Sequence, residues 1–121
     1  IKKFLSNIYE NKPPMINGDG MQTRDFVYVG DVVNANMLAM GSTTKHAFIN
    51  IGTGHSITIL KLAKMIIEAS GLALSPTHRP VLEGDIKESV ADASLARELL
   101  SWTPKVALHD WLKVAIPAKI N

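Results

Sequence analysis

The chain has 121 residues, 46% of them hydrophobic and 20% charged, which is enough apolar material for a folded domain and too little charge for a disordered segment. Its formal net charge is +2 and its basic residues are scattered, so the charge pattern gives no support to nucleic-acid binding. The absence of cysteine excludes disulfides and thiolate metal sites, and with no apolar run of membrane-spanning length we expect a cytoplasmic protein that does not engage a membrane.

The first predicted element is an amphipathic helix over residues 1–10, where apolar side chains recur at helical spacing. Pro13 and Pro14 end it, and residues 15–17 form a short extended stretch. The glycines of residues 18–20 then predict a turn, because glycine readily adopts positive φ. Since the helical pattern is already present at the first residue and no initiating methionine precedes it, we expect the chain to be a piece of a longer protein.

A strand over residues 26–29 and a helix over residues 32–40 are predicted next, with Asp31 as the N-cap of the helix. Apolar side chains occupy more than one side of this helix, a pattern typical of helices that are buried on two faces. A second strand, over residues 47–51, is apolar on both of its faces. We therefore expect the predicted helix and strand to be buried on more faces than the rest of so small a domain can cover.

The longest predicted helix covers residues 59–70, with Ser56 or Thr58 as its cap and Gly71 closing it. Residues 72–90 are predicted to be irregular or extended, with a turn at Gly84 and Asp85.

Two short helices complete the chain, one over residues 92–100 capped by Asp92 or Ser94, and one over residues 109–115. Short strands interleaved with helices indicate an α/β fold class with α+β character. The strands are too few and too short to form a good sheet by themselves, so the pattern describes a fragment of a larger α/β fold.

Residues 52–54, Gly-Thr-Gly, follow a predicted strand and precede the long helix, which is the setting of a dinucleotide-binding fingerprint. The third glycine position of that fingerprint holds Ile57, and Leu72 stands where an acidic residue belongs. The pattern therefore favours a turn with a helix cap over a phosphate site.

Side-chain patterns typical of catalysis or metal binding are not found in the sequence. The four histidines are not paired at i, i+4, so no metal ligand is predicted. Tyr9 and Tyr28 each lack a lysine four residues on, so there is no Tyr-x-x-x-Lys general acid and no catalytic residue is predicted. These observations leave open whether the chain is part of an enzyme.

Arg24 lies between the glycine turn and an apolar run, so its backbone is expected to be well fixed. A guanidinium held in this way suits bidentate recognition of a phosphate. An internal pair between Arg24 and Asp25 that staples the turn explains the same pattern. Local chemistry favours neither interpretation.

Four blocks of the sequence resemble the signatures of nucleotide-sugar epimerases and dehydratases, which are extended short-chain dehydrogenase/reductases, and above all the UDP-glucose 4-epimerase type. The blocks are GDGMQTRDFVYVGDVVNA (residues 18–35), FINIGTG (residues 48–54), GDIKESVADASLA (residues 84–96) and LLSWTP (residues 99–104). Their order and spacing agree with the family over nearly the whole chain.

This resemblance implies that the chain is the C-terminal third of such an enzyme. In the family an N-terminal Rossmann half carries the NAD site and the Tyr-x-x-x-Lys pair. The chain is therefore expected to bind no cofactor itself and to be inactive without that half. The resemblance implies a substrate-binding domain over residues 1–121, with residues 32–52 packed on the edge of the absent Rossmann sheet.

The resemblance also implies where a UDP-sugar lies. The backbone of residues 15–17 meets the uracil base, Arg24 grips the diphosphate, Asp85 lies near the ribose, and Gln22 orients the turn. Leu82 occupies the position of a second diphosphate arginine, and Arg79, three residues earlier, is the candidate to replace it. The complete predicted set is Met15, Ile16, Asn17, Gln22, Arg24, Arg79 and Asp85.

Two alternatives stay open. A stand-alone module with this surface would bind nucleotides or assemble on a partner without catalysis. A dehydratase or reductase would share these blocks, and the sugar is not specified by them. The partners expected for an epimerase are a UDP-sugar, the N-terminal Rossmann half and further copies of the protein in a homo-oligomer.

Overall fold

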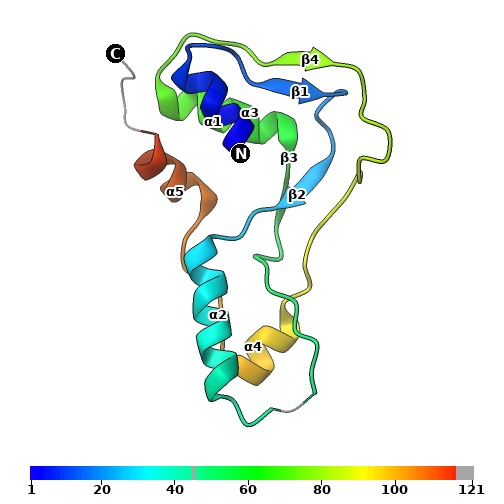
Figure 1. Cartoon of the computed structure of the whole chain (residues 1–121), viewed down its shortest axis with the longest axis vertical. Helices are drawn as coiled ribbons and strands as arrows, with labels where there is room; N and C mark the ends of the chain where they lie inside the picture. Colours follow the sequence, from blue (N-terminus) through cyan, green and yellow to red (C-terminus); the bar gives the residue numbers. More distant parts are fainter. Residues whose placement is uncertain (45, 117–121) are drawn as a thin grey trace. The chain divides into compact units, whose positions relative to one another are not determined.

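The computed structural model describes residues 1–44 and 46–116 (Figure 1). Its elements, in chain order, are α1 (Lys2–Tyr9), β1 (Met15–Asn17), β2 (Thr23–Asp25), α2 (Val29–Gly41), β3 (Ser56–Thr58), α3 (Ile59–Ser70), β4 (Thr77–Arg79), α4 (Ser94–Leu100) and α5 (Leu108–Ala115). Short strands alternate with helices, which confirms the predicted α/β class. No helix in the described part of the chain is long and apolar enough to cross a membrane.

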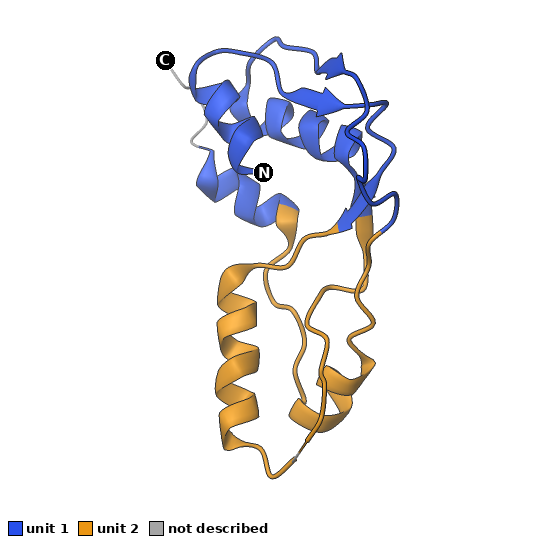
Figure 2. Cartoon of the chain, turned by 45° about the vertical axis from the view of Figure 1, so that its right-hand side comes forward, with its two compact units in different colours: residues 1–24, 57–88, 109–121 blue, residues 25–56, 89–108 orange. Residues whose placement is uncertain are grey.

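The chain folds into two compact units, each built from segments that are distant in sequence (Figure 2). Unit 1 comprises residues 1–24, 57–88 and 109–121, and unit 2 comprises residues 25–56 and 89–108.

In unit 1, helices α1 and α3 pack together, and β1 pairs with β4 in parallel. The register places Met15 opposite Thr77, and Asn17 opposite Arg79. Each large apolar side chain that is fully buried stabilises the unit by about 1.5–3 kcal/mol. The buried apolar side chains include Phe4, Ile8, Ile16, Leu62, Ala63, Ile66, Leu112 and Ile116.

The ends of α3 are those that the sequence predicts. The Thr58 hydroxyl accepts a hydrogen bond from the backbone N–H of Lys61 at 3.1 Å, which satisfies one of the N–H groups that an α-helix leaves unpaired at its start. Gly71 ends the helix in the left-handed conformation with φ of 68°, where a side chain would cost strain.

In unit 2, helices α2 and α4 pack on a small core of Ala35, Ala93, Ala96, Leu100 and Trp102. The Trp102 indole Nε1–H donates to the backbone oxygen of Asp31 at 2.9 Å. The carboxylate of Asp31, which is only 5% exposed, accepts the backbone N–H groups of Lys105 and Val106 at 3.0 and 3.1 Å. This buried acid therefore joins α2 to the segment that follows Trp102.

The predicted boundaries of this unit need three corrections. Helix α2 begins at Val29 with Tyr28 at its N-cap, so Asp31 lies in the first turn. Its carboxylate accepts the backbone N–H groups of residues 105 and 106 instead of capping its own helix. The strand expected over residues 26–29 lies at residues 23–25, where it pairs with β3. Helix α4 has Ala93 at its N-cap, although the Asp92 carboxylate does accept the N–H of Ser94 at 2.9 Å.

The strand predicted over residues 47–51 is not formed. Its composition favours a strand, but strand geometry needs a neighbour with free backbone N–H and C=O groups. In the part of the chain that the structure describes, residues 47–51 pair with no strand, and Phe48 is 99% exposed.

Candidate functional site

Arg24 on β2 is held by three hydrogen bonds within unit 1. Its NH2 group donates to Oδ1 of Asp85 at 2.5 Å, and its NH1 group donates to the backbone oxygens of Thr23 and Ile86 at 2.7 and 2.6 Å. The side chains of the ion pair are 26% and 25% exposed, so water screens the pair less than a surface pair. The alternative interpretation of Arg24, an ion pair with Asp25, is not the one found, because the carboxylate that pairs with Arg24 is that of Asp85.

These contacts leave part of the guanidinium fork available. A guanidinium has five N–H donors, and three of those of Arg24 are engaged by the described residues. The Nε–H and the second hydrogen of NH2 remain, in a group whose plane is already fixed. Such a pair of donors matches two oxygens of a phosphate.

Gln22 connects this ion pair to the end of β1. Its Nε2 group donates to the backbone oxygen of Asn17 at 3.0 Å and to Oδ2 of Asp85 at 3.1 Å. Both oxygens of Asp85 therefore accept hydrogen bonds, one from Gln22 and one from Arg24. Asp85 is the residue around which the other two are ordered.

The glycine turn after β1 is held from two sides. The N–H of Gly18 donates to the oxygen of Arg79 at 2.9 Å, and the oxygen of Gly20 accepts the N–H of Leu60 at 2.9 Å. Gly20 has φ of +78°, and a Cβ there would approach Cβ of Leu60 at 3.0 Å and Cγ2 of Ile16 at 3.1 Å. A side chain at this position would therefore disturb both the turn and the strand before it.

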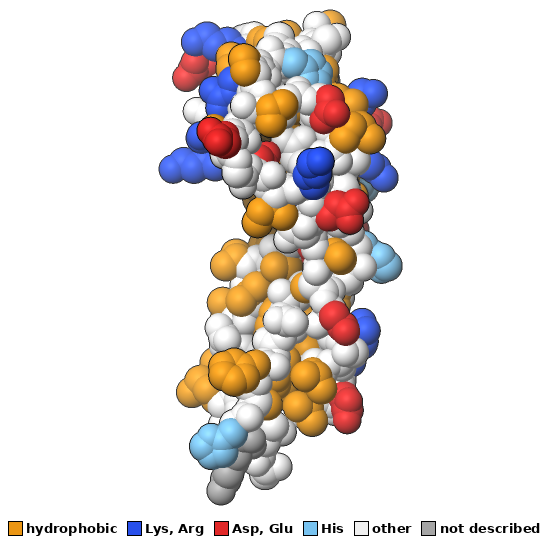
Figure 3. All heavy atoms as spheres, turned by 90° about the vertical axis from the view of Figure 1, so that its right-hand side faces the viewer, with side chains coloured by type: hydrophobic (Ala, Val, Ile, Leu, Met, Phe, Trp, Pro, Cys, Tyr) orange, Lys and Arg blue, Asp and Glu red, His pale blue; other side chains and the backbone are white. Residues whose placement is uncertain are grey.

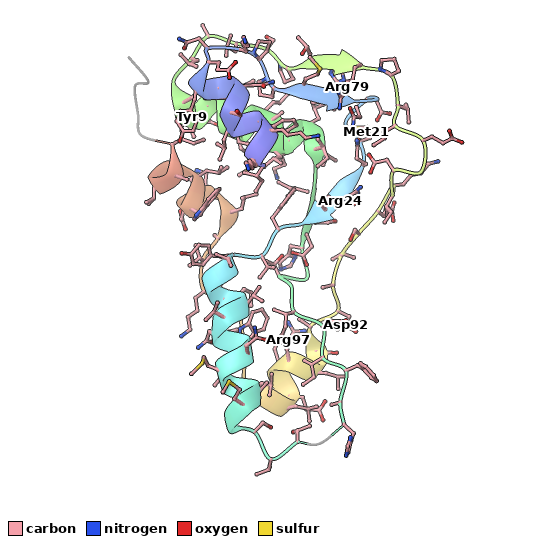
Figure 4. All side chains as sticks on the ribbon, viewed as in Figure 1. Tyr9, Met21, Arg24, Arg79, Asp92 and Arg97 are labelled. Carbon is pink, nitrogen blue, oxygen red and sulfur yellow. The ribbon has the colours of Figure 1, made fainter. Side chains whose placement is uncertain are left out.

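Arg79 lies on β4 beside Asn17, and its Nε donates to the Asn17 side-chain oxygen. Figure 4 labels Arg79 on this strand and Arg24 on β2. Leu82 is 59% exposed and does not line the cleft described next, whereas Arg79 does. Position 79 is therefore better placed than position 82 to contact a phosphate that Arg24 binds.

A cleft of about 360 Å³ in unit 1 brings the predicted set together. All seven residues line it: Met15, Ile16, Asn17, Gln22, Arg24, Arg79 and Asp85. Sequence reasoning missed Lys2 and Lys3, which also line it. The signal was present, because they form the densest basic cluster of the sequence, in the first turn of the first helix.

A second cleft of unit 1, of about 490 Å³, shares Asn17, Gln22 and Asp85 with the first. Its other charged lining residues are Asp19, Lys87 and Glu88. Its acids outnumber its single lysine, so its charge suits a phosphate less well than that of the first cleft.

The Gly-Thr-Gly turn of unit 2 is already occupied by a carboxylate. Oδ1 of Asp25 accepts the N–H and the hydroxyl of Thr53, at 3.0 and 2.5 Å. Its Oδ2 accepts the N–H groups of Gly54 and Ala91, at 3.0 and 3.3 Å. A Cβ at Gly52 would come within 2.8 Å of Asp25 Oδ2, so the close approach requires glycine there.

Burial raises the pKa of Asp25, but its hydrogen bonds from Thr53, Gly54 and Ala91 outweigh it and hold that pKa below the usual range. A phosphate at this turn would compete for N–H groups that already donate to a carboxylate, and would be repelled by it. The geometry therefore favours the interpretation of residues 52–54 as a structural turn.

The chain is similar to known nucleotide-sugar epimerases and dehydratases. The model of the GDP-mannose 4,6-dehydratase family matches residues 1–114. The UDP-glucose 4-epimerase of Mycolicibacterium smegmatis is 37% identical over 107 residues, covering 88% of this chain and 34% of that protein.

Solved structures of epimerases are also similar to this chain, and two of them serve as examples. A UDP-glucose 4-epimerase from Thermotoga maritima with UDP-glucose has a TM-score of 0.88 and 39% identity, covering 93% of this chain and 36% of that one. A UDP-glucuronic acid 4-epimerase from Bacillus cereus, in complex with UDP-glucuronic acid and NAD, has a TM-score of 0.83 and 33% identity, covering 92% of this chain and 36% of that one. The chain thus spans about a third of the length of these relatives.

Proposed function

We propose, from the premise that the chain belongs to the GDP-mannose 4,6-dehydratase family, that it forms the UDP-sugar-binding part of a NAD-dependent nucleotide-sugar 4-epimerase. The observation that carries the proposal is the single cleft lined by all seven residues of the predicted set, with the Arg24 guanidinium fixed in its wall. The two similar structures with UDP-glucose and UDP-glucuronic acid are epimerases, which favours epimerisation over dehydration.

In this proposal the chain's residues position the substrate. The backbone of β1 receives the uracil base, and the two remaining donors of Arg24 hold diphosphate oxygens. Asp85 lies near the ribose and, together with Gln22, keeps the guanidinium plane fixed. A ligand held in this way loses little further freedom when the reaction begins.

NAD would accept and return a hydride at carbon 4 of the sugar, which is chemistry that the cofactor supplies. The backbone N–H groups of Thr53 and Gly54, the part of this chain that most resembles a dinucleotide turn, already donate to Asp25 and do not fit a pyrophosphate. We therefore assign the cofactor and the catalytic tyrosine to the Rossmann half, and expect this chain to show no turnover without it.

Unit 2 carries the surface that would meet that half. Apolar side chains of α2 and of the segment after it are exposed, reaching 81% for Met40 and 99% for Phe48. Figure 3 shows hydrophobic side chains gathered on the face of unit 2 that it displays. Large exposed apolar patches are uncommon on monomers. Residues 32–52 therefore suit the edge of a Rossmann sheet, where residues 47–51 would find a strand to pair with.

The test is an assay of the protein expressed from its complete reading frame, with UDP-glucose and NAD, beside the 121-residue chain alone. We expect interconversion of UDP-glucose and UDP-galactose by the former and none by the latter. Turnover by the 121-residue chain would refute the assignment of catalysis to the Rossmann half. Binding of UDP without any turnover by the complete protein would favour the stand-alone nucleotide-binding module. Cytoplasmic location and homo-oligomeric assembly remain predictions.

A further inference from the structure

The cleft of unit 1 is strongly cationic. Four positively charged side chains line it, those of Lys2, Lys3, Arg24 and Arg79, against the single carboxylate of Asp85. A nucleoside alone would gain little from such an excess, whereas a diphosphate carries at least two negative charges. The charge of the lining thus exceeds what Arg24 alone would provide.

The two arginines are partly committed to other partners. The charge of Arg24 is offset by Asp85 at 2.5 Å, and the Nε–H of Arg79 is used by Asn17. Leu82, where a further arginine would be expected, contributes no charge and lies outside the cleft lining. The arginines therefore leave a diphosphate incompletely neutralised.

The two lysines differ from the arginines in their surroundings. Neither Lys2 nor Lys3 forms an ion pair with any residue in the ranges 1–44 and 46–116. Both lie in the first turn of α1, which contains no acidic residue and where the helix dipole disfavours positive charge. Two adjacent cations at this place cost the helix stability, unless an anion lies against them.

We propose that Lys2 and Lys3 supply the second positive contact to a diphosphate bound in this cleft, in place of an arginine at position 82. A lysine has a flexible stem and three N–H donors, so it can follow an oxygen that the fixed guanidinium of Arg24 does not reach. The inference rests on the proposed function, because it assigns two further residues to the same ligand.

The test compares UDP with uridine by calorimetric titration of the protein expressed from its complete reading frame. The variant is Lys2→Ala with Lys3→Ala. The matched control is Lys61→Ala with Lys64→Ala, which removes the same charge from exposed positions of α3 that do not line the cleft. Lys2→Arg with Lys3→Arg retains the charge, and circular dichroism verifies that α1 is folded in each variant.

We expect the Lys2 and Lys3 alanine variant to bind UDP about ten-fold more weakly, with uridine affinity unchanged, because two exposed charge contacts are lost. The loss should shrink at high salt, and the arginine variant should regain most of the affinity. The Lys61 and Lys64 variant should bind both ligands like the unaltered protein.

Three outcomes overturn the inference, and they are distinguishable from one another. Equal UDP affinity in the lysine variant and the unaltered protein would overturn it while leaving the proposed function intact. Equal weakening of UDP and uridine would assign the lysines to the fold of the cleft. Failure of the unaltered protein to bind UDP at all would remove the proposed function itself.

Discussion

Charged side chains of unit 1 converge on a cleft, whereas the carboxylates of Asp25 and Asp31 in unit 2 are occupied by backbone N–H groups. The apolar side chains show the reverse distribution. Unit 1 buries those of α1 and α3, whereas α2 of unit 2 buries only Ala35 among its apolar residues. Charged side chains are therefore concentrated at a cleft in unit 1, and exposed apolar side chains are concentrated on α2 in unit 2.

The largest expected effect concerns the small core of unit 2. Trp102→Ala removes its largest fully buried side chain and the hydrogen bond to Asp31, so it should lower the free energy of unfolding by about 3–5 kcal/mol. Trp111→Ala, in α5 of unit 1 and only partly buried, is the control and should cost less. Chemical denaturation measures both. Equal losses would mean that unit 2 is not held by the core around Trp102.

Arg24 should dominate binding in unit 1. Arg24→Ala should weaken UDP binding by about 1.5–3 kcal/mol, the usual range for a hydrogen bond to a charged group. Arg24→Lys should recover only part of this, because the planar fork is lost. Arg97→Ala, a cation on α4 of unit 2, is the control in the same calorimetric titration. Unchanged UDP affinity in Arg24→Ala would show that Arg24 does not contact the ligand.

Asp25 should make the stability of unit 2 depend on pH. Its pKa is lowered in the folded state, so its contribution is complete above the unfolded value of about 3.9 and is lost as pH falls through the folded value. Asp25→Asn should therefore be less stable than the unaltered chain at neutral pH, with the difference narrowing in acid. Denaturation curves at a series of pH values would show this. A difference that stays constant would contradict the role of the charge.

The smallest expected effect on stability concerns the exposed face of α2. Met37→Gln with Met40→Gln should change the free energy of unfolding by less than about 0.5 kcal/mol, because both side chains are exposed. The same change should reduce self-association and hydrophobic-dye binding of the 121-residue chain, as measured by light scattering and fluorescence. Val114→Gln, an exposed apolar position in unit 1, is the control. If the unaltered 121-residue chain is monomeric and binds no dye, the exposed face of α2 does not require a partner.

The sequence was most informative where the signal is local. Thr58, one of two candidate caps, and Gly71 are predicted as the ends of α3 from the chemistry of caps, which depends on a few neighbouring residues. The cleft residues were found through the resemblance, since Arg24 and Asp85 are 61 positions apart and no periodicity connects them.

Prediction failed where the partner of a group is distant in the sequence. Asp31 has the composition of an N-cap, but its carboxylate is bound by amides more than 70 residues away. Residues 47–51 have the composition of a strand, but they pair with no strand in the described part of the chain. Lys2 and Lys3 belong to no motif that assigns them to a site, and only the fold shows that they line the same cleft as Arg24.

Hydrogen exchange with and without UDP, on the protein expressed from its complete reading frame, tests the assignment of the ligand to unit 1 most directly. Protection should appear in residues 15–24 and 77–87, which carry β1, the glycine turn, Arg24, Arg79 and Asp85. Residues 47–54 of unit 2 should exchange as they do without UDP. Protection centred on residues 52–54, with none along β1, would contradict the account by moving the phosphate to the turn that Asp25 occupies.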